Sequence, residues 1–251
     1  MPEASPYTRG FRAAVDGMKL AFRNKEVGRA YLKISALIFV LAIALTSGSM
    51  WALWANTSPE TYADAASWVI VALWAARVVG SLLSLILGPL MAIFIANIAF
   101  PLLNVGVFLA GLRAVDPERA EALAAKEGMS VGRSIAIPTW RLIKFLLLTL
   151  CLMIVGLIPV IGTIIATATQ AWLTARAVAW ELVDPYFECL DIRHAEQREF
   201  INKHQKLLIG FGLPISLMLA IPLVGPLLFG LAQAAGAVLV AREIPIDPRE
   251  G

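Results

Sequence analysis

The sequence predicts an all-α integral membrane protein with two long transmembrane helices, two re-entrant (hemi-penetrating) helical hairpins and an amphipathic N-terminal helix. Hydrophobic residues make up 59% of the chain and charged residues 16%, whereas soluble domains are about 45–50% apolar and about 25% charged. The apolar residues form long blocks instead of alternating, which is typical of membrane helices. Two blocks are interrupted by the same Pro-x-x-Gly pattern. We expect a single membrane domain over residues 1–251.

The leader, residues 9–33, is predicted to be an amphipathic helix that lies in the membrane interface. Phe11, Val15, Met18 and Phe22 recur at helical spacing, and mostly basic side chains repeat that spacing one position later. A helix with one apolar face and a basic edge is suited to the headgroup region. A surface helix packed on its neighbours is the alternative.

Two transmembrane helices are predicted over residues 34–55 and 68–104. The first has about 22 residues without a charge, which is enough for a hydrocarbon core of about 30 Å. Trp51 and Trp54 at its end suit the opposite interface. The second block is too long for a simple span and contains one charged residue, Arg77. Arg77 would lie at the outer interface or line an anion pathway.

The second transmembrane block also carries a proline and a row of small residues. Pro89 is a position where the helix could kink. A face of small residues favours close helix packing, and here we expect it to contact a second subunit of a homo-oligomer. The small residues are Gly80, Ser81, Ser84 and Gly88.

Polar segments after the second span are predicted to lie in the cytoplasm. Residues 116–128 read as a short helix with Asp116 as N-cap and Gly128 at its end, and residues 183–206 read as a polar loop. The leader carries seven lysines and arginines up to Lys33, whereas the loop after the first span carries none. By the positive-inside rule the N-terminus is cytoplasmic, and we expect the bacterial inner membrane.

The last two apolar blocks, residues 142–182 and 207–241, are predicted to be helical hairpins. Pro-x-x-Gly divides each block into arms of about 13–16 residues, which reach only about 20–24 Å as helices. Proline ends the first arm and glycine allows a tight reversal. Four thin or tilted full spans are the alternative, and both possibilities return the chain to the same side.

The two hairpins are predicted to be copies of one unit. Equivalent residues are separated by 63 positions over a long stretch, which indicates an internal repeat. The matched pairs are Pro159 with Pro222, Gly162 with Gly225, Gln170 with Gln233, and Ala171 with Ala234.

A hairpin tip inside the membrane would suit an anion. The second arm of each hairpin would begin near mid-membrane, at Gly162 and Thr163 in one copy and at Gly225 in the other. Free N–H groups and the positive end of the helix dipole would then face inward. Gln170 and Gln233 would line the same path or bond the packed arms together.

The residues resemble a known family from about position 133 to 240. The matching stretches are "LIKFLLLTLCLMIVGLIPVIG", "DPYFE" and "GFGLPISLMLAIPLVGPLLFG". They are similar to the C-terminal half of CysZ-like membrane proteins, within the wider etoposide-induced membrane protein superfamily. The resemblance implies a bacterial inner-membrane sulfate permease with two long helices and two hemi-penetrating hairpins, assembled as an oligomer. Separately, we expect no enzymatic activity, because no catalytic constellation appears in the sequence.

The resemblance assigns an anion site before the first long helix, in a Gly-Leu-Arg-Arg-like motif. The corresponding stretch here is "EVGRAYLK", so Gly28 and Arg29 carry over, with Lys25 nearby, and the second arginine is absent. Asp184, Pro185 and His194 match parts of another family motif. Some members of the wider superfamily resemble membrane-organising proteins, so a non-transporting scaffold inserted by its hairpins is the alternative function.

Other kinds of site find little support in the sequence. His194 and His204 are not spaced as a metal pair on one helix face, and no phosphate-binding loop, nucleophile elbow or paired-carboxylate site is recognisable. We expect no metal and no cofactor. The basic leader is predicted to contact membrane lipids and not nucleic acid. Arg176 is expected to snorkel or to pair with Glu181.

Overall fold

The computed structural model describes residues 4–58, 62, 66–99, 101–221 and 224–245, and the regular structure in these ranges is helical. The helices are α1 (Pro6–Arg23), α2 (Lys25–Asn56), α3 (Ser67–Ala99), α4 (Pro101–Arg113), α5 (Pro117–Ala124), α6 (Val131–Gly156), α7 (Ile161–Cys189), α8 (His194–Lys203), α9 (Gln205–Leu219) and α10 (Val224–Glu243).

The chain is an integral membrane protein. Within the described residues, α2, α3 and α6 are each long and apolar enough to cross a bilayer. Almost none of their apolar stretches is buried inside the protein. Because such surface is unfavourable in water, these helices require a lipid environment.

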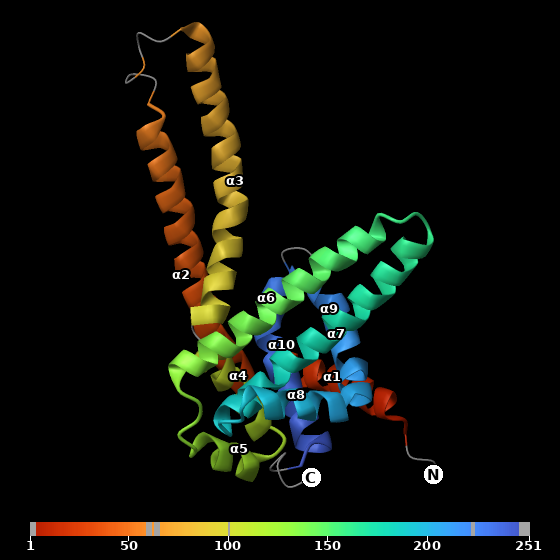
Figure 1. Ribbon diagram of the computed structural model, residues 1–251. Helices are drawn as coiled ribbons and strands as arrows, with labels where there is room; N and C mark the ends of the chain where they lie inside the picture. The colour runs from red at the N-terminus through yellow and green to blue at the C-terminus, as the bar shows by residue number, and fades with distance from the viewer. Residues whose placement is uncertain (1–3, 59–61, 63–65, 100, 222–223, 246–251) are drawn as a thin grey trace. The chain divides into compact units, whose positions relative to one another are not determined.

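The fold divides into two compact units, one formed by residues 33–100 and the other by residues 1–32 and 101–251. The first unit is a helical hairpin in which α2 and α3 run antiparallel (Figure 1). Its helices approach closely where Gly80 meets Leu53 and Gly88 meets Thr46. Trp54 Nε1 donates a hydrogen bond of 3.2 Å to Ser81 Oγ. Part of the small-residue face expected to contact a second subunit is thus used within the hairpin.

The second unit is built around α10. Every residue from Leu231 to Val240 is buried, as expected for a helix that is apolar all round. α1, α4, α7 and α9 pack against it. Small residues make these approaches possible: a side chain at Gly17 would overlap Ala235, one at Gly111 would overlap Ala234, and one at Gly236 would overlap the Leu182 backbone.

The predicted leader, residues 9–33, is divided between two helices. α1 ends at Arg23, and the side chain of Asn24 accepts hydrogen bonds of 2.8 and 3.2 Å from two backbone N–H groups that begin α2. An asparagine at an N-cap starts a new helix. The rest of the leader therefore belongs to α2, which continues without a break through the predicted span at 34–55.

The second span is also shorter than the predicted 68–104. α3 runs through Pro89 and ends at Ala99, and α4 begins at Pro101. Proline has no backbone N–H to continue the preceding helix and is favoured in a first turn. Asn104 consequently lies on α4, where it is buried.

The polar segment at 183–206 is mostly helical and not a loop. α7 continues to Cys189, and α8 follows after a short turn. Residues 182–190 are buried because α7 packs here against α10 and α4. Asp116 does cap α5, but this helix ends at Ala124, and Gly128 lies beyond it at φ +69°.

Both predicted hairpins are present, as α6–α7 and α9–α10. Each first arm ends and each second arm begins at positions that differ by 63, namely Gly156 and Leu219, then Ile161 and Val224. The structure therefore reproduces the repeat found in the sequence. Helices α6 and α7 are longer than the predicted 142–182 because they continue past the apolar arms into polar residues.

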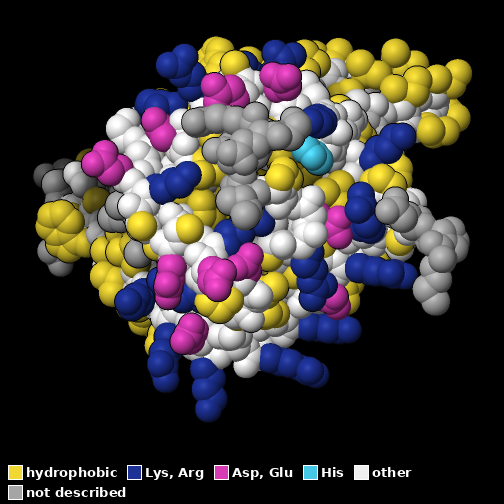
Figure 2. Space-filling view, turned by 90° about the horizontal axis from the view of Figure 1, so that it is seen from below, with side chains coloured by type: hydrophobic (Ala, Val, Ile, Leu, Met, Phe, Trp, Pro, Cys, Tyr) yellow, Lys and Arg dark blue, Asp and Glu magenta, His cyan; other side chains and the backbone are white. Residues whose placement is uncertain are grey.

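Many charged side chains lie on one face of the protein (Figure 2). Viewed from below the orientation of Figure 1, lysine and arginine side chains project from this face, with aspartate and glutamate among them (Figure 2). Two ion pairs join α1 to α10: Arg9 with Glu243 at 3.3 Å and Arg242 with Asp16 at 2.7 Å.

Candidate functional site

The tip of the α6–α7 hairpin is a tight reversal without charged residues. The turn follows Gly156 and includes Pro159 and Val160, and both are exposed. Val160 has φ +64°, a backbone conformation that is strained for a β-branched residue. All the large side chains of this turn are apolar and exposed. Such a tip suits hydrocarbon better than water.

Gly162 and Thr163 hold this turn together. A side chain at Gly162 would overlap the carbonyl oxygen of Val155, so only glycine allows the two arms to approach this closely. The Thr163 hydroxyl donates a hydrogen bond of 3.2 Å to the carbonyl oxygen of Gly156, one of the groups left unpaired at the end of α6. Both predicted site residues therefore have a structural role at the tip.

The second hairpin uses its glycine in the same way. A side chain at Gly225 would overlap the carbonyl oxygen of Leu219, the last residue of α9. The Gly225 N–H donates to the Ile221 carbonyl at 2.7 Å. Pro222, the copy of Pro159, lies outside the described residues.

The two repeated glutamines are in different surroundings. Gln170 Nε2 donates to Thr149 Oγ1 across the hairpin at 3.2 Å, so here the glutamine bonds the packed arms together. Gln233 on α10 is almost fully buried, and its Oε1 has no hydrogen-bond partner among the described residues. An unpaired buried amide oxygen is unfavourable.

The predicted anion-binding residues lie in the first turn of α2. Lys25, Gly28 and Arg29 are all exposed there, and a side chain at Gly28 would meet open space. Within the described part of the chain, no carboxylate lies within ion-pair distance of Lys25 or Arg29. Lys25 and Arg29 therefore lie near the positive end of a helix dipole, where an anion is favoured, and Glu26 is an acidic residue in the same first turn.

Arg77 has a different role from the other predicted site residues. Its Nε donates to Thr57 Oγ1 and its Nη2 to the Trp54 carbonyl, both at 3.1 Å. Its guanidinium also lies over the rings of Trp54 and Trp74, at 4.6 and 5.2 Å. Arg77 is 7% exposed and binds the C-terminal end of α2, where a cation is favoured. This arrangement fits an anchor at one end of the α2–α3 hairpin.

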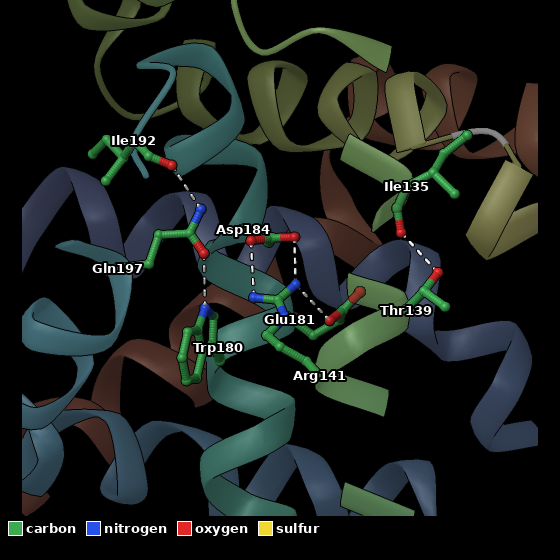
Figure 3. Close-up of polar contacts among 8 residues, drawn as sticks. All are labelled: Ile135, Thr139, Arg141, Trp180, Glu181, Asp184, Ile192 and Gln197. Atoms are coloured by element: carbon green, nitrogen blue, oxygen red, sulfur yellow. Dashed lines mark hydrogen bonds and ion pairs between the residues drawn. The ribbon is translucent and has the colours of Figure 1, made fainter. Parts of the chain in front are cut away.

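A buried ion pair that sequence reasoning missed joins α6 to α7 (Figure 3). Arg141 donates to both carboxylate oxygens of Asp184, at 2.9 and 2.5 Å, and to Glu181 at 3.2 Å. The same guanidinium lies 5.1 Å from the ring centre of Trp180. Glu181 thus pairs with Arg141, so the second of the two expectations for Arg176, pairing with Glu181, is wrong. The spacing of 43 positions between Arg141 and Asp184 hides this pair from any local pattern.

A third carboxyl lies next to this cluster. Glu188 is 8% exposed, and burial together with the negative charges of Asp184 and Glu181 raises its pKa to about 8. The positive charge of Arg141 and a hydrogen bond from Ser134 oppose this rise in pKa. Glu188 is therefore mostly protonated at neutral pH.

The described site residues that the sequence predicts therefore lie in four places: the tip and arms of the α6–α7 hairpin, the start and body of α10, the start of α2, and the α2–α3 hairpin. In the described residues, no group of three or more histidine, cysteine, aspartate or glutamate side chains is arranged to hold a metal ion.

Comparison with known proteins identifies one family. The family model described as sulfate transporter CysZ/etoposide-induced protein 2.4 matches residues 14–229 of this chain. No curated protein matches the sequence significantly.

Proposed function

We infer the function from one premise, that the chain belongs to the sulfate transporter CysZ/etoposide-induced protein 2.4 family. We propose that it is a membrane permease for a small oxyanion, with sulfate as the first candidate. We further propose that it acts as a homo-oligomer in the bacterial inner membrane, with its N-terminus in the cytoplasm. It would need no cofactor and perform no chemical reaction on its substrate.

The cationic first turn of α2 carries this proposal. Lys25 and Arg29 are exposed and have no carboxylate partner among the described residues. Arginine at a helix N-terminus offers charged donors that match the oxygens of sulfate. We assign the capture of the anion from the cytoplasmic side to these two residues and the open backbone at Gly28.

The depth of the α6–α7 hairpin supports a membrane-embedded tip. Lys144 is the last charged residue before the tip and Arg176 is the first one after it. The helical arms between these charges and the tip are about 18 and 22 Å long, less than a hydrocarbon core of about 30 Å. α6 as a whole is long enough to cross, but only if its charged residues Arg141 and Lys144 enter the membrane; we propose that they stay at the headgroup level, so that the hairpin enters the membrane and returns without crossing.

Backbone N–H groups at a membrane-embedded hairpin tip would stabilise the anion inside the membrane. The first turn of α7 has no side-chain cap, and the N–H groups of a first turn have no partner within their own helix. Ile161 N–H is already bonded to the Pro159 carbonyl, so in an oligomer the N–H groups of Gly162 and Thr163 would be the ones that surround a wet path.

Sulfate uptake into proteoliposomes tests the permease. We expect labelled sulfate to enter vesicles that contain the protein, and uptake to fall about tenfold or more in Arg29→Ala because one charge-assisted contact is lost. Arg12→Ala is the matched control, since it removes an exposed positive charge from the same leader, and should change uptake less than twofold.

A non-transporting scaffold remains the second candidate. The observation that favours it is the exposed apolar tip of the α6–α7 hairpin, which would insert in lipid whether or not anything passes. Uptake no greater than in empty vesicles, for the wild type as well as for Arg29→Ala, would contradict the permease and favour the scaffold.

A further inference from the structure

Helices α7 and α8 face each other with two matched stripes of side chains. Trp172, Arg176 and Trp180 are spaced by four along α7, and His194, Arg198 and Asn202 are spaced by four along α8. Side chains four apart lie on the same face of a helix. These six residues are called the α7–α8 stripes below.

Contacts between the stripes show that they meet. Arg176 Nη2 donates to Asn202 Oδ1 at 2.8 Å. The His194 ring stacks on Trp180 at 5.6 Å, with 14° between the ring planes. The Arg176 guanidinium lies between two tryptophans, 5.7 Å from the ring of Trp172 and 5.8 Å from that of Trp180.

The stripes contain positive charge that nothing in the described residues neutralises. Neither Arg176 nor Arg198 has a carboxylate within ion-pair distance in this part of the chain. The nearest acidic cluster, Glu181 and Asp184, is bound by Arg141. Burial lowers the pKa of His194, and so does the positive charge of Arg141, Lys144 and Arg198, while Asp184 acts in the opposite direction.

Two buried nitrogens in the stripes also lack partners. Arg176 Nε and His194 Nδ1 are shielded from solvent and make no hydrogen bond to the described protein atoms. The Nε of arginine is always a donor, and a histidine nitrogen can be one. A buried donor without an acceptor is unfavourable, so the site lacks a group that supplies oxygen acceptors and negative charge.

The stripes lie where the apolar arm of α7 ends. Ile161, Ile164 and Ile165 nearer the tip are exposed, and Arg176 is the first charged residue after them. Trp172 is partly exposed, and Trp140 on α6 is exposed beside Lys144, whose Nζ lies 5.0 Å from its ring centre. Tryptophan with lysine and arginine at the end of an apolar segment marks the headgroup level of a bilayer.

We propose that the α7–α8 stripes bind the phosphate of an anionic phospholipid, with Arg176, Arg198 and Asn202 around the phosphate oxygens and Trp172 against the glycerol and upper acyl chain. A tetrahedral oxyanion satisfies the orphaned donors and the unpaired charges together. A lipid is the source that fits the location, because the phosphate of a bilayer lipid already lies at this level. This site is separate from the α2 first turn and does not depend on transport.

Native mass spectrometry of the intact protein in detergent tests this site. The probes are phosphatidylglycerol, zwitterionic phosphatidylcholine, and inorganic sulfate or phosphate. We expect phosphatidylglycerol to bind at least tenfold more tightly than phosphatidylcholine, and Arg176→Gln and Arg198→Gln each to weaken it about fivefold or more. Arg198 is exposed, so its replacement should leave the fold intact, which circular dichroism would verify.

Arg133→Gln is the matched control: it removes a partly exposed arginine of α6 that pairs with Asp191 and should leave phosphatidylglycerol binding unchanged. Equal binding of both lipids, or no effect of Arg198→Gln in a folded protein, would overturn the site. Inorganic sulfate or phosphate that displaces the lipid at micromolar concentration would reassign the stripes to a free oxyanion.

Discussion

Three arginines with little exposure are stabilised in three different ways. Arg77 binds a carbonyl and a hydroxyl at the end of α2 and lies between two tryptophan rings. Arg141 is neutralised by carboxylates. Arg119 on α5 donates to the carbonyl oxygens of Val240, Ile244 and Pro245 at 2.8–3.0 Å, so it caps the C-terminus of α10. Each arginine joins segments that lie apart in the sequence, which is how a structural arginine differs from the unpaired Arg29.

Glu188 gives the protein a stability that depends on pH. Its pKa in the folded protein is about 8, compared with an ordinary value of 4.5, so the folded state holds this proton more tightly than the unfolded state. Its contribution is complete below pH 4.5 and is lost as the pH rises through 8. Between pH 4.5 and pH 8, the ionisation of Glu188 should therefore lower the free energy of unfolding by up to about 1.4 kcal/mol for each pH unit.

The Glu188→Gln variant tests this assignment. Glutamine resembles the protonated carboxyl but does not ionise, so the decline between pH 5 and pH 8 should become shallower, and the variant should exceed the wild type in stability at pH 8.5. Unfolding in mixed micelles at several pH values measures both effects. The same change at the exposed Glu199 should alter neither, and a decline that persists in Glu188→Gln would assign the pH dependence to another group.

At the scale of elements, the α6–α7 and α9–α10 hairpins have the same kind of glycine-containing turn but lie in different surroundings. Gly162 and Gly225 each allow the second arm to pass close to a carbonyl of the first. Around α6–α7 the arms expose leucine and isoleucine, whereas α10 is enclosed by four other helices. The glycine in each turn therefore determines how closely the two arms approach, whereas the helices that pack on the arms determine whether the hairpin is exposed or buried.

Replacement of Gly162 should destabilise the α6–α7 hairpin. In Gly162→Ala the new methyl group would overlap the Val155 carbonyl, and such overpacking typically costs about 1–3 kcal/mol. Gly156→Ala is a control in the same turn, because its methyl group would meet Ala166 at an ordinary 3.5 Å. Thermal unfolding in detergent compares the two variants, and equal melting temperatures would show that the hairpin does not need this close approach.

At the scale of the whole molecule, the position of the α6–α7 tip decides the topology. In a protein whose two native thiols, Cys151 and Cys189, are replaced by alanine, a cysteine at Ile158 should resist membrane-impermeant maleimide from either side of sealed vesicles. A tip inside hydrocarbon, about 18–22 Å from the charged residues, explains this protection. Mass spectrometry of the labelled protein measures the modification.

A cysteine at Ser58 provides the comparison. Ser58 follows the end of α2, beyond a helix long enough to cross the bilayer, so it should react from the side opposite the N-terminus. If the Ile158 cysteine reacts from that same side, α6 and α7 cross the membrane fully, and the re-entrant arrangement is wrong.

The sequence predicts those parts of the fold that depend on local pattern. Apolar blocks, proline-glycine turns and the offset of 63 are visible in the chain, and they located the long helices and both hairpins. The helical segment at 183–206 was missed because its polar residues are neutralised by distant partners, as Asp184 is by Arg141. The α7–α8 stripes were missed because four-residue spacing on two separate helices has meaning only once the helices face each other.

The enclosure of α10 has a consequence for biosynthesis. α1 leaves the ribosome long before α9 and α10, yet it packs on both and forms ion pairs with Arg242 and Glu243. It must therefore wait for more than 200 residues of synthesis between Arg9 and Glu243 before it reaches these partners. During that interval the amphipathic character of α1 allows it to rest on the bilayer surface, so the membrane holds α1 until α9 and α10 arrive.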